Sequence, residues 1–262
     1  MGTLERMSLQ QAPLRTLPLL CLLLAPATTG AQSDAAAAAV PSLVQKAALA
    51  YAAELRGAIG MQRHFSTTIK AGPVRHSETS ESGILFNNGA FVKIKYYRIA
   101  DDGKAFSTAQ ILARESQTNT DWTAGKIFFK EPYDQRYTDD YSFSQPQACS
   151  GCPSGLLAVN FTSAMHDVQH GKGIMWIDSA SARVTELIYT PNVLPPHATS
   201  GSVTEVSSNP APGIWYVTRI DETYGGKELI IKGTGTFSGT FDQIRRFSSL
   251  AEGQAALDAG TI

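Results

Sequence analysis

The chain has 262 residues, of which 43% are hydrophobic and 17% charged, and its formal net charge is −1. This balance gives no support for nucleic acid or anionic lipid headgroups as the main partner. The length is sufficient for one sizeable domain with its own hydrophobic core.

The first residues predict a secretory signal peptide. Arg6 and Arg15 precede an apolar run at residues 17–25, and small residues follow up to Ala31. We therefore expect cleavage near Ala31 and a periplasmic or secreted protein. An uncleaved anchor is the alternative, but the run is about half of the roughly 20 residues that a membrane span needs. After cleavage, no stretch is long and apolar enough to span a bilayer.

The rest of the chain divides simply. Residues 1–31 are the predicted signal peptide, residues 32–40 form an alanine-rich disordered leader, and residues 41–262 form a single β-rich domain. No internal repeat or charge block interrupts this last part, so we expect one domain.

The domain is predicted to open with a helix that begins at Ser42. Ser42 and Gln45 have the spacing of a capping box, and apolar residues such as Ala47 and Tyr51 repeat on one face. Gly57 is a plausible end. The apolar stripe of this helix needs cover, most simply by the concave side of a sheet.

Strands follow at residues 64–70, 77–86 and 91–99. Asn88-Gly89 between the last two is the strongest hairpin signal in the chain. Ser107 and Gln110 predict a second capping box, which opens a short helix at residues 111–115. With the polar run at residues 116–120, this helix is expected to lie over one rim of the sheet.

Further apolar and β-branched runs predict more strands, and the tail predicts a last helix at residues 250–257. Short links make nearly all strand pairs antiparallel, so we expect a mainly β (α+β) protein with a curved antiparallel sheet. The remaining expected strands are residues 126–129, one within 133–143, 156–162, the hairpin of 173–178 with 182–189, and 202–207.

The stretch at residues 213–247 has the clearest period. Gly225-Gly226 is interpreted as the link of a long hairpin, and apolar residues and glycines alternate with polar residues after it. Gly233, Gly235 and Gly239 fall on the apolar face, where they leave space above the sheet. These glycines either open a ligand cavity, or mark bends, or let a helix lie close.

The cavity hypothesis assigns its wall to aromatic, apolar and glycine residues of the sheet. An ordinary packed core is the alternative for the same side chains. The candidates are Phe91, Tyr96, Trp176, Trp215, Leu229, Ile231, Gly233, Gly235, Phe237 and Phe241.

Two cysteines remain after cleavage, Cys149 and Cys152. In an exported protein, close cysteines most often form a small-ring disulfide that fixes a loop. A redox-active pair or a metal site is the alternative, although the strand-like surroundings lack the strand-to-helix setting of a redox site.

Motifs for catalysis are largely missing from the sequence. No nucleophile elbow, phosphate-binding loop or zinc-protease motif is present, and we expect no cofactor. His166, Asp167 and His170 are the one metal-like cluster. They would share a face only on a helix, and the glycines that follow favour a solvated turn.

The order of elements resembles the periplasmic LolA/LolB-like group of lipoprotein carriers and related envelope-stress regulators. The resemblance is carried by residues 82–86, 91–96, 173–178, 183–187 and 241–247. It implies an incomplete β-barrel whose concave face is covered by helices and holds acyl chains. The insertion at residues 101–125 and the cysteine loop depart from the carriers, and no position can be assigned to a carrier's gating arginine.

Three hypotheses follow. The first is a non-enzymatic, exported carrier that binds a lipid or an acylated protein in an apolar cavity. The second is an interaction or sensory domain of the cell envelope with a filled core and a protein partner. The third is a metal-dependent hydrolase that uses His166, Asp167 and His170.

Overall fold

The structure is a computed structural model that describes residues 40–126, 129–148, 153–195, 197–228 and 231–262. The predicted signal peptide and leader lie outside these residues. The chain from Ala38 to Ile262 is one compact unit. Within the described ranges, no helix has both the length and the apolar character required to cross a membrane.

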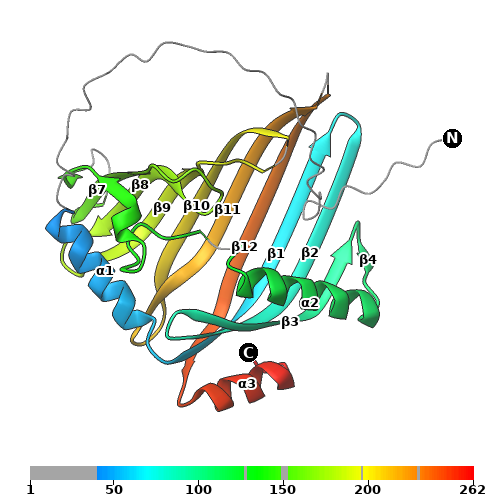
Figure 1. Ribbon diagram of the computed structural model, residues 1–262. Helices are drawn as coiled ribbons and strands as arrows, with labels where there is room; N and C mark the ends of the chain where they lie inside the picture. The colour runs from blue at the N-terminus through cyan, green and yellow to red at the C-terminus, as the bar shows by residue number, and fades with distance from the viewer. Residues whose placement is uncertain (1–39, 127–128, 149–152, 196, 229–230) are drawn as a thin grey trace, which may run out of the picture. The chain divides into compact units, whose positions relative to one another are not determined.

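Twelve strands form one antiparallel sheet in the described part of the chain (Figure 1). Its order runs from β4 through β3, β2, β1, β12, β11, β10, β9, β8 and β7 to β5, and β6 also pairs with β7. In chain order, the strands are β1 Ala58–Ala71, β2 Val74–Asn87, β3 Ala90–Asp101, β4 Lys104–Ala105, β5 Tyr141–Phe143, β6 Gln147–Ala148, β7 Leu156–Ser163, β8 Gly171–Asp178, β9 Arg183–Pro191, β10 Ala198–Ala211, β11 Ile214–Glu228 and β12 Ile231–Phe247.

The order of strands leaves the sheet open, because β4 and β5 at its two ends do not pair with each other. Neighbouring strands of the sheet are close in the chain, with one exception: β1 pairs with β12, which brings the two ends of the domain together. The predicted fold class, an open antiparallel sheet with covering helices, is confirmed.

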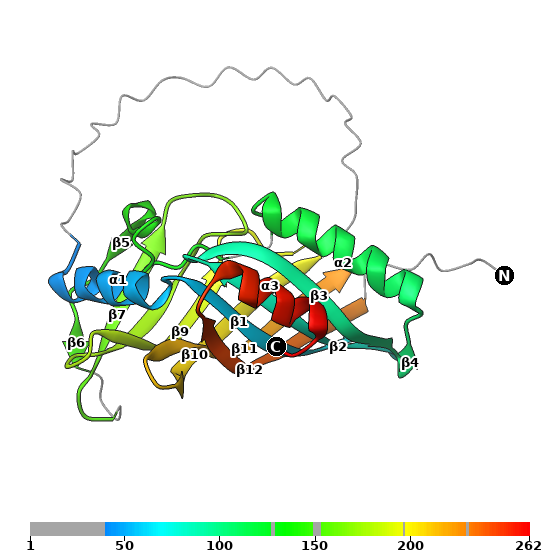
Figure 2. The ribbon, with the colours of Figure 1, turned by 90° about the horizontal axis from the view of Figure 1, so that it is seen from below.

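Three α-helices accompany the sheet: α1 Ser42–Glu54, α2 Thr108–Thr123 and α3 Leu250–Ala259. Strand register places α1 and α2 on one face, here called the inner face, which carries Ile84 and Val203. The opposite, outer face carries Leu85, which packs with Leu257 of α3. Figure 2 shows α3 lying over β1, β2 and β3, with α2 farther along β3.

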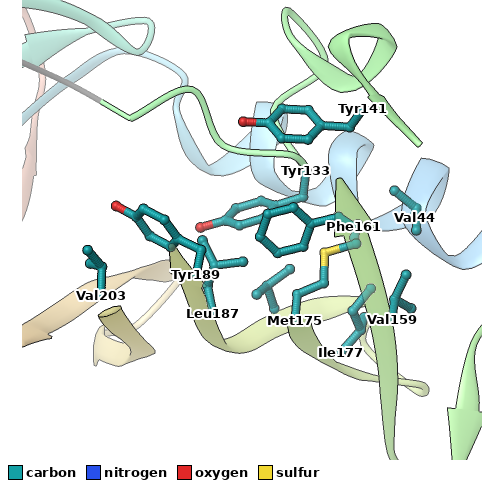
Figure 3. Packing of buried hydrophobic residues seen from close by; sticks show 12 residues of the cluster. Val44, Tyr133, Tyr141, Val159, Phe161, Met175, Ile177, Leu187, Tyr189 and Val203 are labelled. Carbon is teal, nitrogen blue, oxygen red and sulfur yellow. The ribbon is translucent and has the colours of Figure 1, made fainter. Parts of the chain in front are cut away.

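The inner face holds two hydrophobic cores. The first lies under α1, where Val44 and Ala47 pack on β7, β8, β9 and β10; Figure 3 shows its tightly packed side chains. The second lies near α2, where Trp122 packs against the inner residues of β1, β2 and β3. The interval between the two cores is therefore the part of the inner face where a ligand could lie.

The first predicted capping box is wrong. Pro41 is the N-cap of α1, Ser42 is already helical, and the Gln45 side chain donates to the Val40 carbonyl oxygen instead, at 3.0 Å. Proline has a fixed φ that suits the start of a helix, so Pro41 takes the N-cap position that the spacing assigns to Ser42.

The second capping box is confirmed. The Ser107 side chain accepts from the Gln110 backbone N–H, and the Ser107 N–H donates to the Gln110 side chain. The helix that follows is longer than predicted, because the polar run continues it to Thr123. Asn119 in that run binds the edge of β3, which gives these polar residues a reason to be helical.

Gly225-Gly226 is not a turn, and this prediction is wrong. Both glycines lie within β11 and pair with β10 and β12, and the link to β12 falls on residues 229–230, outside the described residues. A Cβ on Gly226 would lie 2.3 Å from the His197 carbonyl oxygen. Glycine is needed here because another backbone approaches closely, which is its second common role in strands.

The other predicted elements agree with the structure in kind. Asn88 and Gly89 have positive φ, as their hairpin requires, and the long strands extend beyond the predicted ends. Of the predicted strand at residues 126–129, Lys126 and Phe129 are not in a strand and the two central residues lie outside the described residues.

Candidate functional site

The middle of the inner face carries half-buried aromatic and apolar residues that neither helix fully covers. This central band comprises Phe65, Ile220, Tyr224, Phe237 and Phe241 from β1, β11 and β12. The Phe65 ring meets those of Phe237 and Phe241 edge-on, with centroids 4.7 and 5.7 Å apart. Aromatic surface of this kind, open on one side, suits contact with an apolar ligand.

The three inner glycines of β12 differ in what lies above them. A Cβ at Gly235 would meet nothing within 4 Å, so the space there is open. A Cβ at Gly239 would lie 2.3 Å from the Phe65 ring, and one at Gly233 would lie 3.1 Å from the Lys70 carbonyl oxygen. The prediction that all three glycines leave free space is therefore wrong for Gly239, where β1 supplies a ring.

Two hollows among the described residues lie elsewhere. One, with room of about 20 Å³, lies between α1 and Trp215. The other, of about 220 Å³, is a polar recess on the outer face between Lys70, Arg75 and threonines of β1 and β12. A large apolar cavity beside Gly235 thus stays a prediction; the structure has an open surface there, which Tyr224 and the inward Glu222 of β11 border.

Polar groups without partners mark one end of the central band. Arg63 and Ser82 are paired across β1 and β2, and only 5% and 1% of their surfaces are exposed. The Arg63 Nε and the Ser82 Oγ have no hydrogen-bond partner. Buried polar atoms of this kind are rare and require an explanation.

The surroundings of Arg63 are aromatic. Its guanidinium lies 4.2 Å from the centre of the Phe65 ring and is also in contact with the Tyr96 hydroxyl, which lies 3.4 Å from the Thr118 hydroxyl of α2. Burial lowers the pKa of Arg63 to about 10, while Tyr96 acts in the opposite direction. The side chain is therefore cationic at neutral pH, although it is removed from water.

Two buried carboxyl groups lie beyond the other end of the band, near α1. Glu205 on β10 is 5% exposed and accepts a hydrogen bond from the Tyr189 hydroxyl at 3.2 Å. Burial raises the pKa of Glu205 to about 7. Burial, and then the charge of Glu205, raise the pKa of Glu131 well above its usual value, and one Glu131 oxygen has no partner.

Tyrosines surround this carboxyl pair from three elements. Burial raises the pKa of Tyr51 on α1, of Tyr133 in the loop before β5, and of Tyr189 on β9, with the acids as a further cause. Figure 3 shows the hydroxyls of Tyr133 and Tyr189 pointing to the same side of the core. Within this group, the hydrogen bond from the Tyr189 hydroxyl to Glu205 joins β9 to β10.

The predicted cavity residues are only partly brought together. Phe237 and Phe241 lie in the central band, and Phe91 and Tyr96 lie in the core near α2, where Phe91 stacks on Trp122 at 5.0 Å. Leu229 and the side chain of Ile231 lie outside the described residues.

The two predicted tryptophans lie away from the central band. Trp176 lies between the inward Met175 and Ile177, so it belongs to the outer face. Trp215 lies beside the end of α1, where its ring N–H donates to the Val184 carbonyl oxygen at 2.9 Å.

The predicted metal-like cluster is only partly brought together. His170 is fully buried, and its two ring nitrogens face Asp167 at 2.8 Å and Asp140 at 3.2 Å, whereas His166 is exposed. These residues are in no helix, as the following glycines favoured, but the predicted solvated turn is wrong for His170, which is buried. His170 fixes the loop before β8 to the start of β5.

A second group with metal-binding atoms lies at the far end of β2 and β3. His76, Asp101 and Asp102 offer atoms within 4.8 Å of one another, and the His76 Nδ1 lies 3.2 Å from each carboxylate. These side chains are between one third and just over one half exposed, and the one His76 nitrogen faces both carboxylates. Cys149 and Cys152 lie outside the described residues, so their disulfide stays a prediction.

Sequence reasoning did not find Arg63, Phe65, Glu131 or Glu205. A signal existed for Glu205, which shares its strand parity with the apolar Val203 and is therefore directed inward. Arg63 shares a parity with Met61 and Phe65 in the same way. A charged residue among the apolar, inward-facing positions of a strand is the sequence pattern that indicates such a buried charge.

Comparison with solved structures gives matches at low identity. A putative outer membrane lipoprotein-sorting protein domain from Vibrio parahaemolyticus is 10% identical, with a TM-score of 0.39 over 83% of this chain and 98% of that chain. A DUF1329 family protein from Desulfovibrio piger is 10% identical, with a TM-score of 0.39 over 82% and 97%. A LolA superfamily protein from Nitrosomonas europaea is 13% identical, with a TM-score of 0.36 over 80% and 94%.

No family model matches the sequence, and no curated protein matches it either. The solved structures include a LolA superfamily member. At such low similarity, what this chain binds has to follow from its own residues.

Proposed function

We propose that this protein is an exported, non-enzymatic carrier that binds the apolar chain of a lipid or of an acylated protein against the inner face of its sheet. The central band carries the proposal: aromatic residues there are half-buried, and Gly235 leaves open space beside Phe237. The chain would act in the periplasm or outside the cell, as its first 31 residues suggest.

The affinity of such a site would come from the burial of methylene groups. Each CH₂ removed from water contributes about 0.8 kcal/mol, so eight of them would contribute about 6 kcal/mol before the cost of binding. The half-buried rings of Phe65 and Phe237 supply the contact surface, and no bond has to be made or broken.

Helix α2 is the element suited to admit the chain. Only Thr118 of its 16 residues is buried, whereas α1 buries four residues, including Val44 and Ala47. A helix with so little buried surface moves at low cost. Movement of α2 would uncover Tyr96 and Phe91, and would lengthen the central band toward β3.

Native mass spectrometry of protein purified from the cells that make it, with titration of a fluorescent fatty acid, tests this function. Gly235→Leu fills the open space and should weaken fatty-acid binding about tenfold. Thr236→Leu on the exposed outer face of the same strand is the matched control and should bind as the wild type does. If the wild type carries no bound lipid and does not bind the fatty acid, the proposal is refuted.

A second candidate is an interaction domain of the cell envelope with a filled core. The observation in its favour is that the hollow beside α1 has room for only about 20 Å³ and the other lies on the outer face. Such a domain would retain one protein partner in a pull-down from envelope extract, and Gly235→Leu would leave that capture unchanged.

A further inference from the structure

Arg63 is a buried cation without an acid. No ion pair of Arg63 is present among the described residues, whereas other arginines, such as Arg114 and Arg183, each pair with a glutamate. Its neighbours are the Phe65 ring and the Tyr96 hydroxyl. A buried charge is normally paired, so the missing anion is a feature of this position that needs a cause.

Two further groups converge on the same place. Ser82 is the register partner of both Arg63 on β1 and Tyr96 on β3, so the three side chains form one row across the inner face. The Ser82 hydroxyl has no partner, as the Arg63 Nε has none. Thr118 of α2, 5% exposed, lies above the row, with its hydroxyl 3.4 Å from that of Tyr96.

The chemistry of this row is that of an anion site. An arginine N–H can only donate, and the hydroxyls of Ser82, Tyr96 and Thr118 can donate as well. An oxyanion that accepted from these groups would satisfy both unpartnered atoms at once. Guanidinium and carboxylate or phosphate oxygens form strong charge-assisted bonds, particularly where water is excluded.

The row continues directly into the central band. Arg63 is paired with Phe241 on β12 and is two residues from Phe65 on the same face of β1. An anionic head at the row therefore leaves its apolar chain against Phe65, Phe237 and the open space at Gly235. The position of Thr118 above the row means that α2 would close over the head.

We infer that the ligand is an anionic amphiphile, whose carboxylate or phosphate group is held by Arg63 and Ser82 while its apolar chain lies along the central band. This inference rests on the proposed carrier function and adds the charge of the ligand to it. A ligand with an uncharged head would leave the guanidinium buried without a counter-charge.

Two fluorescent probes with the same chain and fluorophore, a long-chain fatty acid and the matching fatty alcohol, test the inference. The wild type should bind the acid about tenfold more tightly than the alcohol, in line with the strength of a charge-assisted bond. Arg63→Met keeps the length and packing of the side chain and should abolish this preference, with unchanged affinity for the alcohol. Ser82→Ala should reduce the preference by a smaller factor.

Arg98→Met, at an exposed position of β3, is the matched control and should keep the preference. Equal affinity of the wild type for acid and alcohol would overturn the inference and leave the carrier function in place. No binding of either probe would overturn both. Displacement of the fatty acid by inorganic phosphate alone, at millimolar concentration, would show that Arg63 holds a free anion and would also overturn the inference.

Discussion

Substitution of Glu205 by glutamine should change how the stability of this protein depends on pH. Glu205 and Glu131 are buried beside each other on β10 and in the loop before β5, and both have raised pKa values. An acid whose pKa is raised by folding binds its proton more tightly in the folded state. Its contribution to stability is therefore complete below the unfolded pKa and is lost as the pH rises through the folded pKa.

The size of the effect follows from the pKa of Glu205, which burial moves from 4.5 to about 7. One pKa unit corresponds to about 1.4 kcal/mol, so the wild type should lose about 3 kcal/mol of unfolding free energy between about pH 4.5 and about pH 8. Glu205→Gln removes this loss, because an amide has no proton to release. Its side chain can still accept from the Tyr189 hydroxyl, so the variant should be at least as stable as the wild type at about pH 8.

Urea denaturation at about pH 5 and about pH 8, followed by tryptophan fluorescence, measures the free energies. The difference between wild type and variant reports on the pair of Glu205 and Glu131, because the charge of Glu205 also raises the pKa of Glu131. Glu186→Gln removes a charge from the outer face of β9 and should leave the pH dependence unchanged. If Glu205→Gln and the wild type lose the same free energy over this range, the carboxyl pair does not titrate as its burial requires.

Two further substitutions test the connections between elements. Arg183→Met removes the 2.5 Å ion pair with Glu54 at the end of α1 and leaves an unpaired carboxylate whose side chain is 11% exposed. The unfolding free energy should therefore fall by about 2 kcal/mol in the same urea experiment. An unchanged value would show that the ion pair is dispensable. His170→Ala should lower the unfolding free energy by about 2 kcal/mol, because its contacts with two aspartates are lost. The zinc content, measured by mass spectrometry, should equal that of the wild type. A loss of zinc in the variant would restore the metal-site hypothesis.

The elements that the sequence predicts well are those fixed by local chemistry. Asn88-Gly89 makes a turn because both residues tolerate positive φ, and Ser107 with Gln110 caps α2 through side chains three residues apart. Neither feature depends on distant parts of the chain, and a window of a few residues is enough to find it.

The features that the sequence could not show depend on strand neighbours. Gly226 resembles a turn residue, and only the approach of His197, just before β10, explains why it lies inside a strand. In β12, Gln243 has a positive φ and the register with β1 shifts, so Ile244 points inward and Phe247 points outward after the regular alternation up to Phe241. Such a change of face is not visible in an alternating pattern.

The same limit explains why the two ends of the site were missed. Arg63 is buried because Phe65 and Tyr96 lie over it, and Glu205 is buried because Tyr189 and the loop with Glu131 cover it. Except for Phe65, which lies on β1 with Arg63, each of these neighbours comes from another strand or loop. Strand parity alone could have directed both side chains inward, but it could not have shown that one lacks a partner and the other has a second acid beside it.

The two inner helices are held to the sheet by different chemistry, which decides where the inner face can open. Helix α1 is held by fully buried apolar residues such as Val44, and its displacement would expose a core. Helix α2 is held largely by hydrogen bonds to the edge of β3: the Asn119 amide accepts from the Ile94 N–H at 2.9 Å and donates to the Ile94 carbonyl oxygen at 3.0 Å. Glu115 also accepts from the Tyr96 N–H at 3.0 Å.

These bonds are partly buried, and each contributes about 1 kcal/mol net. Opening at α2 breaks these bonds and the ring contacts of Trp122, whereas opening at α1 exposes fully buried side chains such as Val44. A ligand that reached the central band would enter from the β3 side, past Thr118 and toward Arg63. Helix α2 and the unpaired Arg63 lie at the same end of the central band. Binding of a charged head beneath a closing helix requires this arrangement.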